Sequence, residues 1–169
     1  MRYLLGVGVC GMLGLVLTAT AQDKKEPPDL DKIPKAVMDG LKAKFPRPVI
    51  TKWTRETEAG KVVYDIEFTQ DGRKCEADIY EDGSIHNFER AIEAKDLPKA
   101  VTDAVEKKYP KATMKTVMEI TEVKDRKEAL EGYEIELVTA DKKDVEVTVA
   151  PDGKVLEDST EEKKKDEKK

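Results

Sequence analysis

Two short segments of the chain carry apolar residues at every fourth position, within residues 33–46 and within residues 97–110. This spacing places the apolar side chains on one side of a helix, so each segment predicts one amphipathic helix. An aspartate, Asp31 or Asp96, precedes each segment and is expected to cap the helix. A Phe-Pro or Tyr-Pro pair ends it, because proline cannot continue a helix. The two apolar stripes are Ile33, Val37, Leu41 and Phe45, and Leu97, Val101, Val105 and Tyr109.

After each helix, apolar and polar residues alternate in short runs, several of which are separated by Gly-containing pairs such as Asp-Gly. Alternation with a period of two predicts half-buried strands, and Asp-Gly pairs favour tight hairpin turns. We therefore predict an α+β fold in which each helix packs on a four-stranded antiparallel meander sheet. The predicted strands are 49–57, 61–69, 73–80 and 84–90 after the first helix, and 113–123, 132–139, 144–150 and 154–157 after the second.

The two units are copies of one another. Ile-Pro-Lys-Ala-Val at 33–37 returns as Leu-Pro-Lys-Ala-Val at 97–101, and Tyr-Asp-Ile-Glu at 64–67 returns as Tyr-Glu-Ile-Glu at 133–136. Such an internal repeat is stronger evidence than any local motif. We expect the two sheets to join edge to edge, with the extra residues of the second copy in a long turn at 124–131. The predicted units are repeat 1 at 31–92 and repeat 2 at 93–157.

Strand alternation gives the two faces of each sheet opposite character. Apolar side chains such as Tyr64, Ile66 and Phe68 point one way and are expected to meet the helix. The opposite face, which we call the outer face, is markedly acidic. Its predicted carboxylates are Asp65, Glu67, Glu76 and Asp78 in repeat 1, and Glu134, Glu136, Asp144 and Glu146 in repeat 2.

The single tryptophan, Trp53, is expected on the outer face. In the first strand of repeat 2, Met118 and Ile120 are assigned to the helix side together with Met114. Val117 then points outward, and Trp53 aligns with Val117 in the repeat. A one-residue bulge in the strand of Trp53 would reverse this assignment and turn the indole into the core. The sequence leaves both arrangements open.

The ends of the chain differ from the repeats. Residues 1–21 combine a basic start, a short apolar run and an Ala-Thr-Ala end, which is typical of a secretory signal peptide cleaved after Ala21. An uncleaved membrane anchor is the alternative, although the run is slightly short of a span. The strongly polar lead-in at 22–30 and tail at 158–169 are expected to be disordered. We predict a periplasmic or secreted protein without a stable membrane anchor after cleavage.

Charge and cysteine content limit the partners. The chain has 31 basic and 36 acidic residues, and this balance disfavours nucleic acid as a partner. Cleavage would leave one cysteine, Cys75, so no disulfide could form within the mature chain. We read Cys75 as a small buried strand residue in a monomer, with a reactive or intermolecularly bridged thiol as the alternative.

Patterns of catalytic chemistry are missing from the sequence. The only histidine, His86, has no second histidine or cysteine nearby to complete a zinc site. The chain has no Gly-x-Ser-x-Gly elbow and no glycine-rich phosphate loop. Paired carboxylates are expected on any solvated face of so acidic a chain, and acid–base catalysis would need one of them desolvated in a cleft. We therefore predict no enzymatic activity, no cofactor and no metal centre.

The repeated pattern resembles a known family. Leu/Ile-Pro-x-Ala-Val opens each helix, Phe/Tyr-Pro closes it, and a Tyr-x-Ile strand and a final Asp-Gly hairpin follow, over residues 30–157. These features resemble the PepSY-like proteins that are labelled beta-lactamase-inhibitor-like. The resemblance implies a small exported module without enzymatic activity, in a family named for likeness to a tandem-repeat inhibitor that acts through its concave sheet surface. Fold alone does not transfer that function, and no inhibitory residue is matched here.

Three interpretations of the acidic face stay open. The face could bind a protein partner of basic character, with Trp53 as an aromatic anchor, and so act as a binding or inhibitory module. It could instead hold a ligand or a divalent cation as a sensor, since carboxylate oxygens are the ligands that Ca²⁺ prefers. It could also be merely solvated and keep an exported protein soluble. The candidate partner-binding residues are Trp53, Asp65, Glu67, Glu76, Asp78, Glu134, Glu136 and Glu146.

Overall fold

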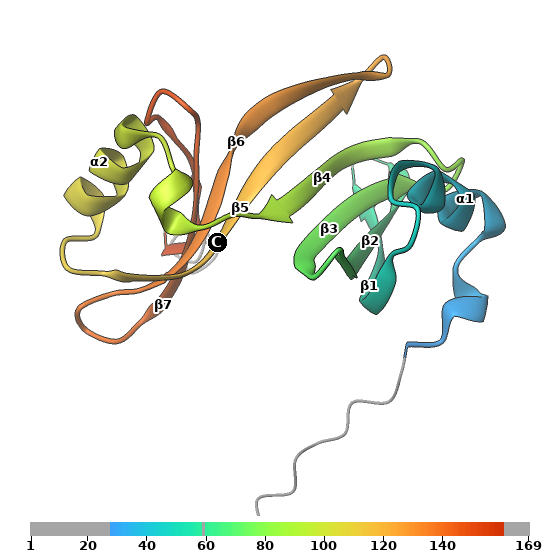
Figure 1. Ribbon diagram of the computed structural model, residues 1–169, viewed down its shortest axis with the longest axis horizontal. Coiled ribbons are helices and arrows are strands. Elements are labelled where there is room, and N and C mark those ends of the chain that lie inside the picture. Colours follow the sequence, from blue (N-terminus) through green and yellow to red (C-terminus); the bar gives the residue numbers. More distant parts are fainter. Residues whose placement is uncertain (1–27, 59, 161–169) are drawn as a thin grey trace, which may run out of the picture.

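The computed structural model describes residues 28–58 and 60–160. The predicted signal peptide, most of the lead-in at 22–30 and the tail beyond residue 160 lie outside the described residues. The described chain contains two α-helices and eight strands, arranged as two successive units of one helix and four strands (Figure 1). Within these ranges no helix is long and apolar enough to cross a membrane.

A short 3-10 turn and an α-helix open each unit. The helices are α1 (Lys35–Lys44) and α2 (Lys99–Lys108), and each begins directly after a proline. Both predicted apolar stripes are confirmed, with every member buried except the partly exposed Tyr109. The predicted aspartate caps are wrong. Asp31 and Asp96 lie in the 3-10 turns upstream of the prolines, and neither helix has a side-chain cap hydrogen bond.

All eight strands belong to one antiparallel sheet whose order follows the chain. The expectation that the two four-stranded meanders join edge to edge is confirmed, because β4 pairs with β5 over residues 87–91 and 118–122 and makes one continuous sheet of them. The strands are β1 (Val49–Glu58), β2 (Lys61–Gln70), β3 (Arg73–Tyr80), β4 (Ile85–Ala91), β5 (Thr113–Lys124), β6 (Lys127–Val138), β7 (Asp144–Val149) and β8 (Val155–Asp158).

The last Asp-Gly turn of each unit also positions its helix. Gly83 and Gly153 adopt positive φ values of 86° and 89°, which favour glycine. A Cβ atom added at Gly83 would lie 2.4 Å from the carbonyl oxygen of Ala36, and one at Gly153 would lie 2.6 Å from that of Ala100. Each turn therefore lies directly against the first turn of the helix, and any side chain there would separate the two.

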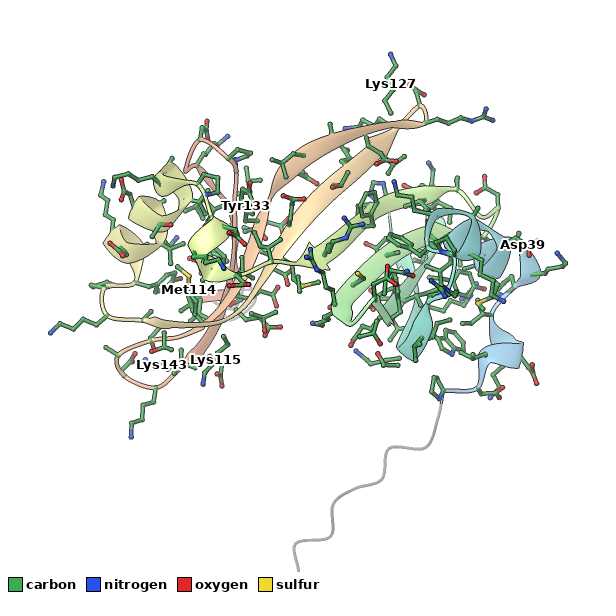
Figure 2. All side chains as sticks on the ribbon, viewed as in Figure 1. Asp39, Met114, Lys115, Lys127, Tyr133 and Lys143 are labelled. Carbon is green, nitrogen blue, oxygen red and sulfur yellow. The ribbon has the colours of Figure 1, made fainter. Side chains whose placement is uncertain are left out.

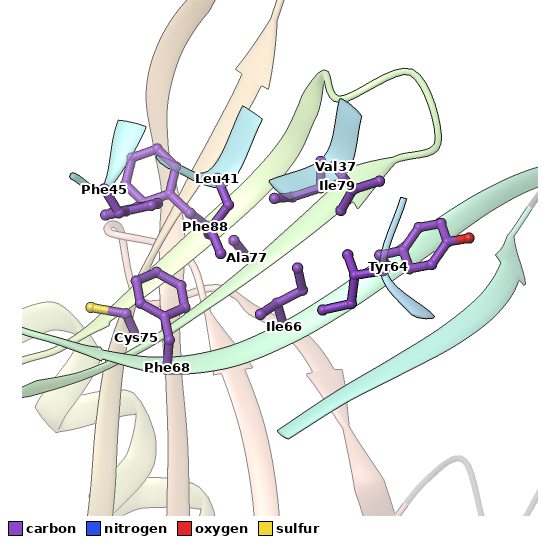
Figure 3. Packing of buried hydrophobic residues seen from close by; sticks show 11 residues of the cluster. Val37, Leu41, Phe45, Tyr64, Ile66, Phe68, Cys75, Ala77, Ile79 and Phe88 are labelled. Carbon is purple, nitrogen blue, oxygen red and sulfur yellow. The ribbon is translucent and has the colours of Figure 1, made fainter. Parts of the chain in front are cut away.

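Every repeat buries its own apolar core between helix and sheet. In repeat 1, the ring of Phe45 lies 4.8 Å from that of Phe68 and 5.6 Å from that of Phe88 (Figure 3). Cys75 is fully buried in this core, which confirms its reading as a small buried strand residue. The second core is formed by Leu97, Val101, Val105, Val117, Tyr133, Ile135, Leu137, Val145, Val147 and Val149.

The long turn predicted at 124–131 is wrong. β5 continues to Lys124 and β6 begins at Lys127, so only Asp125 and Arg126 remain in the turn, both at positive φ. Two residues with positive φ form the tight turn that matches strand twist. The extra residues of repeat 2 therefore lengthen a hairpin. Alternation failed to predict it because the residues at 127–131 are all exposed and carry no buried face.

The charged tail predicted at 158–169 begins too early. Asp158 ends β8 and is only 4% exposed. Its carboxylate accepts hydrogen bonds from the Tyr109 hydroxyl at 2.5 Å and the Lys108 ammonium at 2.6 Å. Burial alone would raise the pKa of Asp158, but these bonds, with those from Thr160, hold it well below its usual range. The aspartate therefore fastens the last strand to the end of α2.

A pair of substitutions in α2 tests the packing of repeat 2. Val101 is fully buried, so Val101→Asp places an unpaired charge in the core and should lower the free energy of unfolding by about 3 kcal/mol or more. Lys99 is exposed and its ion pair with Asp103 is screened by water, so Lys99→Asp should leave the free energy of unfolding nearly unchanged. Urea unfolding measures both values, and equal effects of the two substitutions would contradict this packing.

Candidate binding face

The outer face brings the predicted carboxylates together. In the register of β2 and β3, Asp65 lies opposite Asp78 and Glu67 lies opposite Glu76. In repeat 2, Glu136 of β6 lies opposite Glu146 of β7. Like charges directly opposite one another on neighbouring strands are destabilising. The sheet therefore carries an electrostatic strain on this face that paired cations can relieve.

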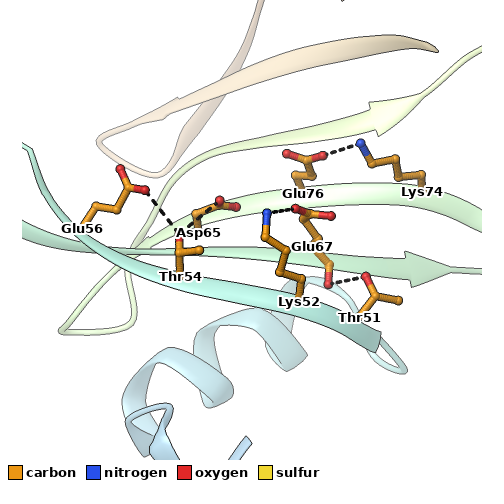
Figure 4. Close-up of polar contacts among 8 residues, drawn as sticks. All are labelled: Thr51, Lys52, Thr54, Glu56, Asp65, Glu67, Lys74 and Glu76. Atoms are coloured by element: carbon orange, nitrogen blue, oxygen red, sulfur yellow. Dashed lines mark hydrogen bonds and ion pairs between the residues drawn. The ribbon is translucent and has the colours of Figure 1, made fainter. Parts of the chain in front are cut away.

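Lysines relieve part of this strain in repeat 1. The Lys52 ammonium lies 2.6 Å from the Glu67 carboxylate, and the Lys74 ammonium lies 2.7 Å from that of Glu76 (Figure 4). The pKa of Lys52 is raised by its hydrogen bond to Glu67. This half of the face therefore has the interleaved cations that are expected of a solvated surface.

The junction between the repeats contains an acidic residue that the sequence analysis missed. Glu89 of β4 lies opposite Glu76, and its Oε2 atom is buried without a hydrogen-bond partner in the described chain. Burial raises the pKa of Glu89 to about 8, and the negative charges of Glu134 and Glu76 add to the effect. Burial likewise raises the pKa of Glu134 to about 7 and that of Asp65 to about 6. Glu89 could have been found only from the strand register, since its neighbours in sequence are not acidic.

A hollow of about 240 Å³ opens beside Glu89. Its wall includes side chains from both repeats and no lysine or arginine. Five of the lining residues carry carboxylates, and the remainder are polar or apolar. The charge of this hollow is therefore not balanced by the residues that line it. They are His86, Asn87, Glu89, Ile120, Glu122, Glu131, Glu134, Thr148, Leu156 and Glu157.

An aromatic pair lies next to the hollow. The ring of His86, which lines the hollow, is 5.2 Å from the ring of Tyr80, and the Lys61 ammonium lies 4.7 Å from the Tyr80 ring centroid. Tyr80 pairs with Val63, which shares its side of β2 with Asp65, so Tyr80 belongs to the outer face. The face therefore has aromatic surface, although not the residue that we predicted.

The prediction that Trp53 lies on the outer face is wrong. A register shift between Ile50 and Lys52 turns Trp53 to the helix side, where it pairs with Ile66 and packs on the first core. Its indole nitrogen donates a hydrogen bond to the carbonyl oxygen of Asp29 at 3.2 Å. The bulge that the sequence left open as the alternative is therefore the observed arrangement, and it removes Trp53 from the candidate binding residues.

A matching bulge explains the related error in repeat 2. The register of β5 shifts between Met114 and Thr116, so Met118 and Ile120 lie on the outer face and Val117 on the helix side, the reverse of the assignment. Met118 pairs with Glu134 and is almost fully buried. Apolar side chains thus surround the carboxylates at the junction, which is one reason why burial raises their pKa values.

Three carboxylates of repeat 2 lie close enough to share a cation. Oxygens of Glu134, Glu136 and Glu146 lie within 4.8 Å of one another. Glu136 also accepts a hydrogen bond from the Thr116 hydroxyl at 2.7 Å. Asp144, which we placed with them on the same face, is exposed at the start of β7 and is not part of this cluster.

Comparison with known proteins identifies relatives of the fold. The family described as "Putative beta-lactamase-inhibitor-like, PepSY-like" matches residues 20–86 and again 62–157. No curated protein matches the chain.

Solved structures show the same fold at low sequence identity. One described among "putative periplasmic proteins" from Bacteroides eggerthii has a TM-score of 0.58 and 17% identity, covering 79% of this chain and 88% of its own. A DUF2874 family protein from Bacteroides uniformis has a TM-score of 0.57 and 16% identity, with coverages of 74% and 87%. A BLIP-like protein from Bacteroides fragilis has a TM-score of 0.50 and 19% identity, with coverages of 79% and 86%.

The raised pKa values predict that stability falls as the pH rises. Between about pH 4 and 8 the folded protein holds protons on Asp65, Glu89 and Glu134 that the unfolded chain has released, so the free energy of unfolding should fall across this range. Glu89→Gln mimics the protonated form. It should raise the free energy of unfolding at pH 8 by about 1 kcal/mol, after allowance for solvent screening, and change little at pH 5.

Urea unfolding at pH 5 and pH 8 measures the effect of this substitution. Glu106→Gln is the control, because it removes one negative charge from the exposed side of α2. Its stability should fall from pH 5 to pH 8 as that of the wild type does, so the effect of Glu106→Gln on the free energy of unfolding should be the same at both pH values. A wild-type stability that rises from pH 5 to pH 8 would contradict the proposed protonation of the junction.

Proposed function

The chain belongs to the beta-lactamase-inhibitor-like, PepSY-like family, and we propose that it is an exported, non-enzymatic binding module whose outer face docks a protein partner with a basic surface. Export is supported by the signal-peptide pattern of residues 1–21 and by the similar fold of the structure described as periplasmic. A binding role is supported by the BLIP-like description of one similar structure. The direct support comes from the charge distribution on the outer face.

The unpartnered carboxylate oxygen of Glu89 is the observation that carries this proposal. It is buried at the centre of the face, opposite Glu76 and near Glu134, where the protein provides no cation in the wall of the hollow. Leaving a buried acceptor unpaired costs about 1–3 kcal/mol. A lysine or arginine side chain of a partner would pair with this oxygen and offset the repulsion among its neighbours.

The two halves of the face are not equivalent for such a partner. Lys52 and Lys74 already pair with the carboxylates of repeat 1, so a partner would have to displace them. The charge of Lys74 lowers the pKa values of Glu89 and Glu134, but by less than burial raises them. We therefore place the main cationic contact on β4 to β7. Tyr80 and His86, beside the hollow, supply the aromatic contact that interfaces favour.

A divalent-cation sensor is the second candidate function. The clustered oxygens of Glu134, Glu136 and Glu146 are of the hard type that Ca²⁺ prefers. Glu134 belongs both to this cluster and to the hollow, so a bound cation would compete with a basic partner for the same carboxylate. Simple solvation explains repeat 1 better than the junction, because Glu67 and Glu76 form ion pairs with lysines, whereas the buried Oε2 atom of Glu89 has no hydrogen-bond partner in the described chain.

A defined basic probe tests the binding proposal. The wild-type protein should bind a short oligolysine peptide in calorimetry, and the affinity should fall with added salt. At about pH 9, where Glu89 and Glu134 are ionised, Glu89→Gln combined with Glu134→Gln should weaken binding about tenfold, equivalent to about 1.4 kcal/mol. Asp103→Asn combined with Glu106→Gln removes the same charge from exposed positions of α2 and should leave binding nearly unchanged. Equal weakening by both pairs would mean that only net charge matters.

A calcium titration tests the second candidate. A ligand at 100 times its dissociation constant stabilises the folded state by about 2.7 kcal/mol, so Ca²⁺ should raise the thermal midpoint if the cluster binds it. Glu136→Gln combined with Glu146→Gln should abolish that rise, whereas Glu106→Gln should not. An unchanged midpoint in wild-type protein at millimolar Ca²⁺ would rule out the sensor function.

A further inference from the structure

The hairpin formed by β5 and β6 extends beyond its own repeat. Its strands have 12 residues each, against 10 in β1 and β2, the matching hairpin of repeat 1. The ladder of β6 with β7 begins only at Tyr133, so residues 127–132 have no strand partner on that side within the described chain. In Figure 1 this part of the hairpin projects past β7, and Lys127 marks its tip in Figure 2.

The far half of this hairpin, residues 121–130, contacts repeat 1 instead. We call it the strap. Thr121 and Glu122 pair with Phe88 and Asn87 of β4, and the side chain of Val123 packs against the first core. These contacts pack a partly buried apolar residue of repeat 2 against the core of repeat 1.

A polar contact joins the strap to α1. The ammonium of Lys44, the last residue of α1, lies 2.5 Å from a carboxylate oxygen of Glu128. The same ammonium lies 4.6 Å from the centroid of the Phe88 ring, at the edge of the first core. The Lys44 side chain is partly buried, at 30% exposure, whereas Glu128 is exposed at 49%, so the pair is screened by water on the Glu128 side.

Such contacts matter because little else joins the repeats. The two cores are separate, and the sheet passes from one to the other only through the ladder of β4 with β5. Neighbouring strands can vary in twist over a range of about 25°. A single ladder therefore leaves the angle between the repeats adjustable. Contacts of the strap with α1 and the first core continue from the end of this ladder to the helix side of repeat 1, and they can fix the angle.

We propose that the strap makes the two repeats one cooperative, rigid unit and thereby fixes the curvature of the outer face. Lys44, Val123 and Glu128 act as positioning residues in this arrangement. The proposal is independent of what the outer face binds, because it concerns only the coupling of the repeats. It also gives a role to the extra residues of repeat 2, which have no counterpart in repeat 1.

The single tryptophan allows a direct test with the full chain. Trp53 lies in repeat 1, so its fluorescence follows repeat 1 alone, whereas far-ultraviolet circular dichroism follows both repeats. In wild-type protein the two urea transitions should coincide. Replacing residues 122–129 by Asn-Gly closes the hairpin after the pair Thr121 and Leu130. In this variant the Trp53 midpoint should fall below the circular-dichroism midpoint by about 0.5 M urea or more.

Charge reversal provides a variant that keeps the hairpin intact. Lys44→Glu should separate the two transitions, and adding Glu128→Lys should bring them together again. A loss of stability alone would move both transitions equally, so their separation reports coupling. The matched control exchanges the charges of an exposed ion pair within α1, as Lys35→Asp combined with Asp39→Lys. In this control the fluorescence and circular-dichroism transitions should still coincide. Coincident transitions in Lys44→Glu, or separate transitions in the wild type, would overturn the proposal, even if the shortened variant does not fold.

A distance measurement checks the rigid angle itself. Spin labels at Lys42→Cys and Lys107→Cys, both exposed on the helices, report the separation of the repeats in a Cys10→Ser background. Cys75 is fully buried and should not be labelled. The distance distribution should be narrow in the wild type, broader with Lys44→Glu, and narrow again with the reversed pair. Equal widths in all three proteins would contradict a fixed angle.

Discussion

Backbone pairing between β4 and β5 joins two repeats that have separate cores, and the outer face exists as one surface only because of this pairing. Strand alternation continues through the ladder, so carboxylates that belong to different repeats appear on the same side. Glu89 of repeat 1 and Glu134 of repeat 2 come within electrostatic range in this way. The ladder alone does not fix the angle between the repeats. The contacts of the strap with α1 and the first core can fix it.

Carboxylates accumulate on the outer face at a cost in stability. The helix side provides the apolar burial that holds each repeat together, so the outer side is free to carry charge. In repeat 1, lysines on neighbouring positions reduce the cost. At the junction, Met118 and Ile120 bury part of the surface and the wall of the hollow contains no lysine or arginine, so protonation relieves much of the repulsion there, with a smaller contribution from the charge of Lys74. Such an arrangement is easier to understand as a surface that another molecule completes than as one that serves solubility alone.

Patterns with a local cause were predictable from the sequence, and patterns that depend on register were not. The helix stripes, the Asp-Gly turns and the repeat follow from spacing and turn chemistry, and the predicted strands lie close to the observed ones. The two bulges in β1 and β5 shift alternation by one residue, which reversed the faces assigned to Trp53 and Met118. No residue type marks these bulges, because neither involves a glycine. Glu89 and the strap were missed for the same reason, since both are defined by pairing between distant segments.

The hollow at the junction connects the strap to the outer face. Repeat 1 contributes His86, Asn87 and Glu89 to the wall of the hollow. Repeat 2 contributes the other carboxylates, and one of them, Glu122, belongs to the strap. A change in the angle between the repeats would therefore alter the distances among these carboxylates directly. Conversely, a cation that draws them together would favour one angle over others, because a ligand shifts an equilibrium by its difference in affinity for the two states. A rigid strap then acts in favour of binding, since it holds the carboxylates in place before the partner arrives and removes the need to order them afterwards.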